Sequence, residues 1–131
     1  MPVKKTFTLD VPGAVLTYDV REAETPTDEP PIVMIGSPMG AEGFRTLAGH
    51  FTDRTVVTYD PRGVERSTVE ETAAPATPYT HADDVHALIG EVATGPVDLV
   101  ASSGGAVNAL RVDEPLRGRN DRNPTGTAPN F

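Results

Sequence analysis

Short apolar runs alternate along the first hundred residues with polar segments that contain glycine or proline. Runs of four or five apolar or β-branched residues between such segments are typical of strands buried on both faces of a parallel sheet. The pattern predicts three strands of this kind, at residues 32–35, 55–59 and 97–101. Nearer the start, residues 6–9 and 14–20 alternate weakly around a Val-Pro-Gly turn and predict an antiparallel hairpin at a sheet edge.

Helical periodicity appears in two places between these strands. A first apolar set with the spacing i, i+3, i+4, i+7 predicts a short amphipathic helix: Phe44, Leu47, Ala48 and Phe51. A second set predicts the inner face of another helix: Val85, Leu88, Ile89 and Val92. For this second helix Thr80 is the expected N-cap, with Asp83 completing a capping box. Residues 60–79 contain three prolines and are predicted to form a long loop.

A third helix is expected to start near residue 106, so the predicted order is β-β-β-α-β-α-β-α. Such an order is typical of an α/β fold with a mostly parallel sheet and helices on both of its faces, in three layers. We expect residues 1–112 to form one domain. Residues 113–131 are polar and contain three prolines, which favours a disordered tail.

Two serines, Ser102 and Ser103, come directly after the last predicted strand. A reactive serine in a sharp strand-to-helix turn needs small residues two positions away on either side, because the strained backbone leaves no room for a bulky side chain. Ser103 has Ala101 and Gly105 at these positions, whereas Ser102 has a valine on one side. Ser103 is therefore the candidate nucleophile.

The segment ASSGG, residues 101–105, resembles the nucleophile elbow of the α/β-hydrolase fold, small-x-Ser-x-Gly. Residues 33–44, VMIGSPMGAEGF, are similar to the His-Gly-x-Pro loop after the third strand of this family, with Ile35 in place of the histidine. Residues 59–67, YDPRGVERS, are similar to the family's Asp-x-Arg-Gly-x-Gly-x-Ser loop, with Glu65 where a glycine is usual. Taken singly, the second segment fits any turn, and Asp60 with Arg62 fits a local ion pair.

The resemblance extends over about residues 5–110 and implies a partial α/β-hydrolase fold. It implies a serine hydrolase that acts on ester or related acyl bonds of a small molecule. Ser103 is the implied nucleophile, and the backbone N–H groups of Ser37 and Gly104 are the implied oxyanion hole. The resemblance implies no cofactor and no metal ion.

The general base that such a serine needs is missing from its expected place. In this family the acid and the histidine of the triad follow the serine, but His50, His81 and His86 all precede Ser103. Of these, His81 alone is expected at the same edge of the sheet as the serine. We therefore expect a truncated site with little or no activity. Two alternatives stay open: a non-catalytic fragment that binds a small ligand, and a non-functional remnant.

The net charge and the composition of the chain disfavour several classes of binding partner. A formal net charge of −8 disfavours nucleic acid and anionic membranes. No apolar segment has the length of a membrane span, and without cysteine the expected compartment is the cytoplasm. The strand at residues 97–101 is expected to leave an apolar edge unpaired, which favours self-association.

Overall fold

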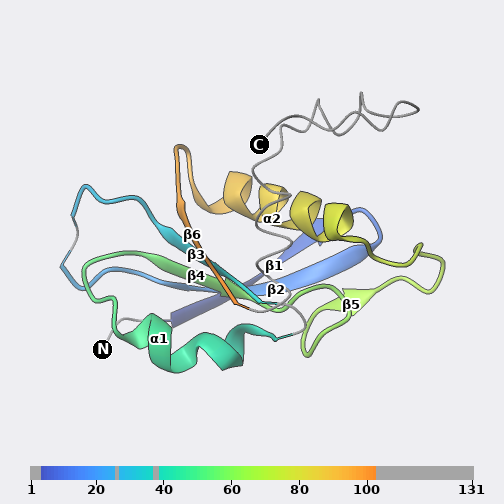
Figure 1. The fold of residues 1–131 in the computed structure, drawn as a ribbon, viewed down its shortest axis with the longest axis horizontal. Helices are drawn as coiled ribbons and strands as arrows, with labels where there is room; N and C mark the ends of the chain where they lie inside the picture. Colours follow the sequence, from blue (N-terminus) through green and yellow to red (C-terminus); the bar gives the residue numbers. More distant parts are fainter. Residues whose placement is uncertain (1–3, 26, 37–38, 103–131) are drawn as a thin grey trace.

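The computed structural model describes residues 4–25, 27–36 and 39–102. Over this part of the chain six strands form one sheet: β1 (Lys4–Val11), β2 (Ala14–Arg21), β3 (Ile32–Ile35), β4 (Val56–Tyr59), β5 (Thr68–Val69) and β6 (Asp98–Ala101). The helices are η1 (Ala41–Phe44), α1 (Arg45–Gly49) and α2 (Pro78–Val92). The sheet has the order β1-β2-β4-β3-β6, and β5 pairs with β2 (Figure 1).

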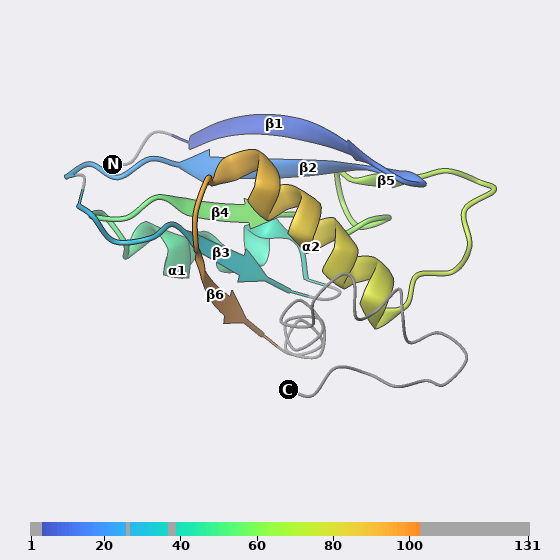
Figure 2. The same cartoon turned by 90° about the horizontal axis from the view of Figure 1, so that it is seen from above.

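The sheet is mixed. Strands β4, β3 and β6 run parallel to one another, whereas β2 is antiparallel to β1, β4 and β5. Seen from above, the β1–β2 hairpin borders one side of the sheet and β6 the other (Figure 2). The antiparallel hairpin that the sequence predicts at a sheet edge is therefore present, and its strands are longer than the predicted ones.

Helices cover both faces of the sheet, α2 on one face and η1 with α1 on the other (Figure 1). Successive residues of β3 alternate between these faces, as strand geometry requires. Val33 and Ile35 pack with the α2 residues Val85 and Leu88. The opposite core cluster consists of Ile32, Met34, Phe44, Ala48 and Val56. Two apolar cores on either side of one sheet confirm the predicted three-layer α/β class.

Three local predictions are corrected by the structure. Helix α2 begins at Pro78, and Thr77 is its N-cap, so Thr80 lies at the third helical position and completes the capping box in place of Asp83. Leu47, expected on the inner face of the first helix, is 42% exposed, because that helix is only five residues long and follows a 3-10 turn. The long loop at residues 60–79 contains the short strand β5.

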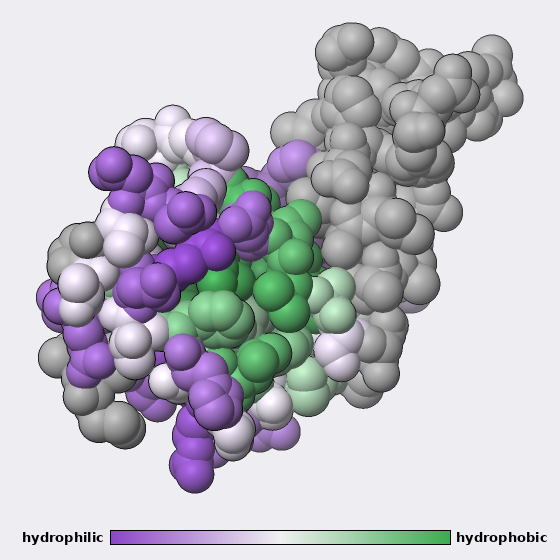
Figure 3. Space-filling view, turned by 60° about the vertical axis from the view of Figure 1, so that its left-hand side comes forward, coloured by the Kyte–Doolittle hydropathy of each residue, from purple (hydrophilic) through white to green (hydrophobic). Residues whose placement is uncertain are grey.

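Among the strands that the structure describes, β6 has a single neighbour, β3. Its residues Leu99 and Val100 are half-buried. Figure 3 shows a patch of hydrophobic residues on the side of the molecule that β6 borders. Self-association through this edge stays a prediction, as does the division at residue 112, because residues 103–131 lie outside the described part of the chain.

Candidate active site

The loops that carry the predicted nucleophile and the predicted oxyanion donor start side by side. Ile35 at the end of β3 pairs with Ala101 at the end of β6. The Ser102 N–H donates to the Ile35 carbonyl oxygen at 3.0 Å. The carboxyl ends of parallel strands lie at one edge of a sheet, where α/β proteins place their ligands. The oxyanion hole that the resemblance implies requires β3 and β6 to be adjacent, and the structure meets this condition.

The predicted site residues Ser37, Ser103 and Gly104 themselves lie outside the described residues. The same holds for the expected strand-to-helix turn at Ser103 and for the expected loose packing of residues 113–131. The structure describes the ends of β3 and β6, the start of η1 and the loop that follows β4.

Asp60, directly after β4, is a buried carboxylate that binds both η1 and its own loop. The Ala41 N–H donates to Asp60 Oδ1 at 2.8 Å. Arg66 donates to Asp60 Oδ2 twice, from its backbone N at 3.1 Å and from Nε at 2.7 Å. The Asp60 residue is only 1% exposed. A local ion pair between Asp60 and Arg62, which the sequence alone permits, is not what forms, because Arg66 takes that place.

Arg66 also binds a second buried carboxylate, Asp19 of β2. Its Nη1 and Nη2 atoms donate to the two Asp19 oxygens at 3.2 and 3.0 Å, and Thr6 Oγ1 donates to Asp19 Oδ1 at 2.6 Å. Burial by itself raises the pKa of the Asp19 carboxyl, but the hydrogen bonds from Arg66 and Thr6 outweigh it and hold this pKa below its ordinary value. Asp19 and Asp60 in turn raise the pKa of Arg66.

Arg62, in the loop after β4, forms an ion pair with Asp84 of α2. Its Nε and Nη2 atoms donate to the two carboxylate oxygens of Asp84, both at 2.8 Å, and Nη2 also donates to the Pro12 carbonyl oxygen at 2.8 Å. The Arg62 and Asp84 side chains are only 6% and 3% exposed. The hydrogen bonds that Arg62 donates to Asp84 raise the pKa of Arg62 against the opposing effect of burial. Arg62 therefore joins the loop after β4 to α2 and to the β1–β2 turn.

Ser67 closes this loop. Its hydroxyl donates to the Asp60 carbonyl oxygen at 2.6 Å and accepts a hydrogen bond from the Thr17 N–H at 2.9 Å. Asp60, Arg62 and Ser67 are all residues of the motif identified in the sequence, and each has a distinct partner. Arg66, Asp19 and Asp84 were not singled out from the sequence. For Asp19 and Asp84 the signal that could have found them is a charged residue among the apolar positions of β2 and α2.

The two glycine positions of the motif are explained by backbone conformation. Gly63 has φ of +75°. Glu65, where the family usually has the second glycine, has φ of +47°, in the left-handed region that side chains other than glycine rarely adopt. This loop therefore carries backbone strain at Glu65.

We expect Glu65→Gly to raise the free energy of unfolding by about 0.5–1 kcal/mol, because relief of the left-handed strain exceeds the entropy cost of glycine. Urea unfolding followed by circular dichroism measures the change. Glu71→Gly is the control, since Glu71 has no positive φ and glycine there is expected to lower stability slightly. A loss of stability in Glu65→Gly as large as in the control would contradict the prediction.

His81, in the first turn of α2, lies at the predicted edge of the sheet and is half-buried. Burial lowers the pKa of His81, Asp84 opposes this lowering and Arg62 adds to it. Of the other two histidines, His50 is exposed and follows α1. His86 lies in α2, and within the described residues its buried Nε2 atom has no hydrogen-bond partner. No group of three potential metal ligands occurs in the described part of the chain.

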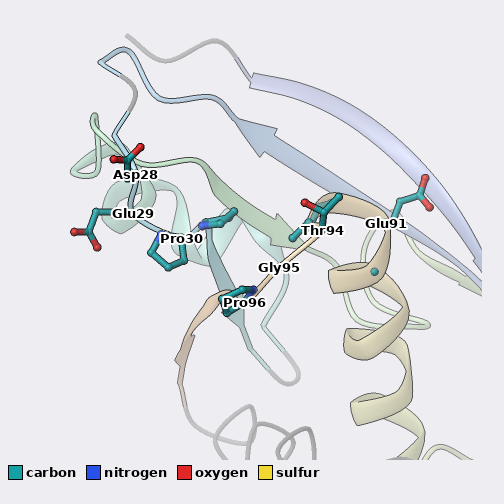
Figure 4. Close-up of a pocket in the computed structure, with 11 residues that line it drawn as sticks. Asp28, Glu29, Pro30, Glu91, Thr94, Gly95 and Pro96 are labelled. Atoms are coloured by element: carbon teal, nitrogen blue, oxygen red, sulfur yellow. The ribbon is translucent and has the colours of Figure 1, made fainter.

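Two hollows lie near the ends of the sheet. A cavity of about 280 Å³ adjoins the Asp60 loop and is lined by Lys4, Asp19, Glu42, Asp60, Glu65 and Arg66. A larger hollow of about 470 Å³ lies at the opposite edge, between residues 28–31 before β3 and residues 90–96, which form the end of α2 and the segment after it (Figure 4). Of these two, the smaller one adjoins the loop after β4. No helix in the described part of the chain has the length and apolar character to cross a membrane.

Comparison with known proteins agrees with this arrangement. The sequence model of the alpha/beta hydrolase family matches residues 32–125. An uncharacterized hydrolase of Bacillus subtilis (strain 168), YraK, is 37% identical over 106 residues, which make up 79% of this chain and 37% of that protein. The chain thus spans little more than a third of the length of this curated relative.

Solved structures share the fold at low sequence identity. A putative epoxide hydrolase from Pseudomonas aeruginosa has a TM-score of 0.68 and 20% identity, over 86% of this chain and 37% of that one. The thioesterase domain from the curacin biosynthetic pathway has a TM-score of 0.69 and 20% identity, over 84% and 41%. An epoxide hydrolase from Vigna radiata has a TM-score of 0.66 and 22% identity, over 81% and 32%.

Proposed function

Because this chain belongs to the α/β hydrolase family, we propose that it carries the nucleophile and the oxyanion hole of a serine hydrolase. Ser103 is the proposed nucleophile, and the backbone N–H groups of Gly104 and Ser37 are the proposed oxyanion donors. The observation that supports this most directly is the pairing of β3 with β6, which starts the two loops concerned at neighbouring strand ends. The proposed substrate class is a small molecule with an ester or related acyl bond.

The proposed chemistry is attack of the Ser103 Oγ on the carbonyl carbon of the substrate. The carbonyl oxygen becomes an oxyanion, which two fixed N–H dipoles stabilise more in the transition state than in the ground state. Because the sequence has no histidine after His86, the serine proton passes to solvent water. Collapse of the oxyanion then breaks the acyl–oxygen bond of the substrate, and the released alkoxide takes a proton from water. The carboxylates after Ser103 are Asp113, Glu114 and Asp121. No cofactor or metal enters this proposal, and a cysteine-free chain suits the cytoplasm.

Without a base the serine hydroxyl is a weak nucleophile, and loss of triad members typically costs several orders of magnitude in rate. We expect this chain to hydrolyse 4-nitrophenyl acetate close to the buffer rate, and Ser103→Ala to change that rate by less than about twofold. A boronic acid is a Lewis acid: the Ser103 Oγ adds to boron and the hydroxyl proton is released to solvent water, so the step needs no protein base. We therefore expect 4-nitrophenylboronic acid to form a tetrahedral adduct, visible by ¹¹B NMR, that Ser103→Ala abolishes.

Each measurement has a result that contradicts the proposal. A tetrahedral boron signal equal in both proteins, or absent from both, would show that Ser103 is not a nucleophile beside an oxyanion hole. Rapid ester hydrolysis that disappears in Ser103→Ala would instead show that the chain supplies its own base. His81→Gln would then be the next variant, because His81 lies at the correct edge of the sheet.

A further inference from the structure

We propose that Asp60, bound by Arg66, is a positioning residue for the loop between β3 and η1. This inference rests on the proposed function, which places one oxyanion donor in that loop. An oxyanion hole requires donors fixed to within a fraction of an ångström, so a device that holds the loop has a direct effect on the site. The loop after β4 is the part of the family motif for which the proposed chemistry has no other use.

The first support is the contact between Asp60 and the start of η1. The Ala41 N–H donates to Asp60 Oδ1 at 2.8 Å, and both groups are buried. A Cβ added to Gly40 would lie 2.6 Å from Asp60 Oδ1, so the backbone approaches the carboxylate more closely than any other residue type allows. The backbone at Gly40 and Ala41 therefore packs directly against the Asp60 side chain.

The second support is that Asp60 itself cannot move. Its other oxygen, Oδ2, accepts from the Arg66 backbone N and from Arg66 Nε. Arg66 is held in turn by Asp19 of β2, through Nη1 and Nη2. A fully hydrogen-bonded buried carboxylate has a single favourable orientation, because every alternative leaves a donor or an acceptor without a partner. Asp60 therefore holds the backbone at Gly40 and Ala41 in a fixed position relative to the sheet.

Asp60→Asn is the sharpest test because it keeps the size of the side chain. An amide has one acceptor oxygen and one donor nitrogen, whereas Asp60 uses both oxygens as acceptors. Either orientation of the amide sets a donor against a donor, at Ala41 or at Arg66. We expect amide hydrogen exchange at Ala41 to accelerate about 10-fold or more, and the affinity for 4-nitrophenylboronic acid to fall by a similar factor.

Asp19→Asn is the matched control. Asp19 is also buried and binds the same arginine, but its side-chain hydrogen bonds within the described residues are with Thr6 and Arg66, not with η1. We expect it to lower stability and to reduce the boronic acid affinity, but by less than about threefold, because Arg66 loses one of its anchors while the bond between Asp60 and Ala41 remains. Arg66→Lys is a milder change at the same place. Lysine keeps the backbone N–H that donates to Asp60 and loses the Nε donor, so we expect a smaller acceleration of exchange and a smaller loss of affinity. If Asp60→Asn does not fold, Arg66→Lys tests the positioning role in its place.

The outcomes separate the two proposals. Equal losses of affinity in Asp60→Asn and Asp19→Asn, or unchanged exchange and affinity in Asp60→Asn, would overturn the positioning role. If the unmodified chain forms no Ser103-dependent boronic acid adduct, the proposed function fails. Exchange at Ala41 then decides by itself whether Asp60 holds the loop: faster exchange in Asp60→Asn supports this, and unchanged exchange overturns it.

Discussion

Replacing Arg62 with methionine is expected to lower the free energy of unfolding by about 3–5 kcal/mol, because it leaves the Asp84 carboxylate buried without its counter-charge. The two side chains are 6% and 3% exposed, and two parallel hydrogen bonds of 2.8 Å join them. The substitution also removes the donor to the Pro12 carbonyl oxygen. Methionine keeps the aliphatic length of the side chain, so the effect isolates the lost charge and hydrogen bonds.

The double variant Arg62→Met/Asp84→Leu tests this cause. Removal of both charges abolishes the penalty of an unpaired carboxylate, so we expect it to recover most of the lost stability in urea unfolding. Lys5→Met is the control, since the ion pair of Lys5 with Glu22 is exposed and 3.7 Å long. Its expected effect is within about 0.5 kcal/mol. A loss below about 1 kcal/mol in Arg62→Met would contradict the buried character of the pair.

Phe44→Ala is expected to cost about 3–5 kcal/mol, since it opens a cavity in the smaller of the two cores. Phe44 is 3% exposed and packs with Ile32, Met34 and Val56 of the sheet. No other aromatic side chain occupies that core cluster, although Phe51 borders it. The lost contacts therefore have no ready replacement in the described structure.

Leu47→Ala, in the adjoining helix α1, is the control. Leu47 is 42% exposed, so its truncation is expected to change the free energy of unfolding by less than about 1 kcal/mol. Guanidinium or urea unfolding of both variants at one temperature measures the difference. Similar losses in the two variants would mean that α1 packs as the sequence periodicity predicts and not as the structure has it.

Much of the fold follows from local pattern. The runs at β3 and β4 were predictable because a strand buried on both faces must be apolar at nearly every position. The same prediction was wrong for β6, which lies at the edge of the described sheet with Asp98 and Ala101 exposed. The hairpin of β1 and β2 was predictable from its turn. The predictions that were wrong depend on the exact length of a helix and on the segments packed against it. They are the N-cap of α2 and the burial of Leu47.

For the candidate site, too, the sequence predicted some features and not others. Motif order and spacing pointed to the segments of Ser37, Ser103 and Asp60, since each follows a predicted strand. The partners of the charged residues were not predictable. Asp60 binds Arg66 and Arg62 binds Asp84, although sequence proximity favours a pair between Asp60 and Arg62.

By itself, then, the sequence determined the α/β class, the order of the elements and the absence of a histidine after Ser103, because these depend only on residue types along the chain. Tertiary structure alone decided that β3 lies beside β6, that Arg66 joins Asp19 to Asp60, and that Glu65 has a left-handed backbone. The physical reason is that strand order and ion pairing depend on distances between segments far apart in sequence. Local periodicity contains no information about those distances.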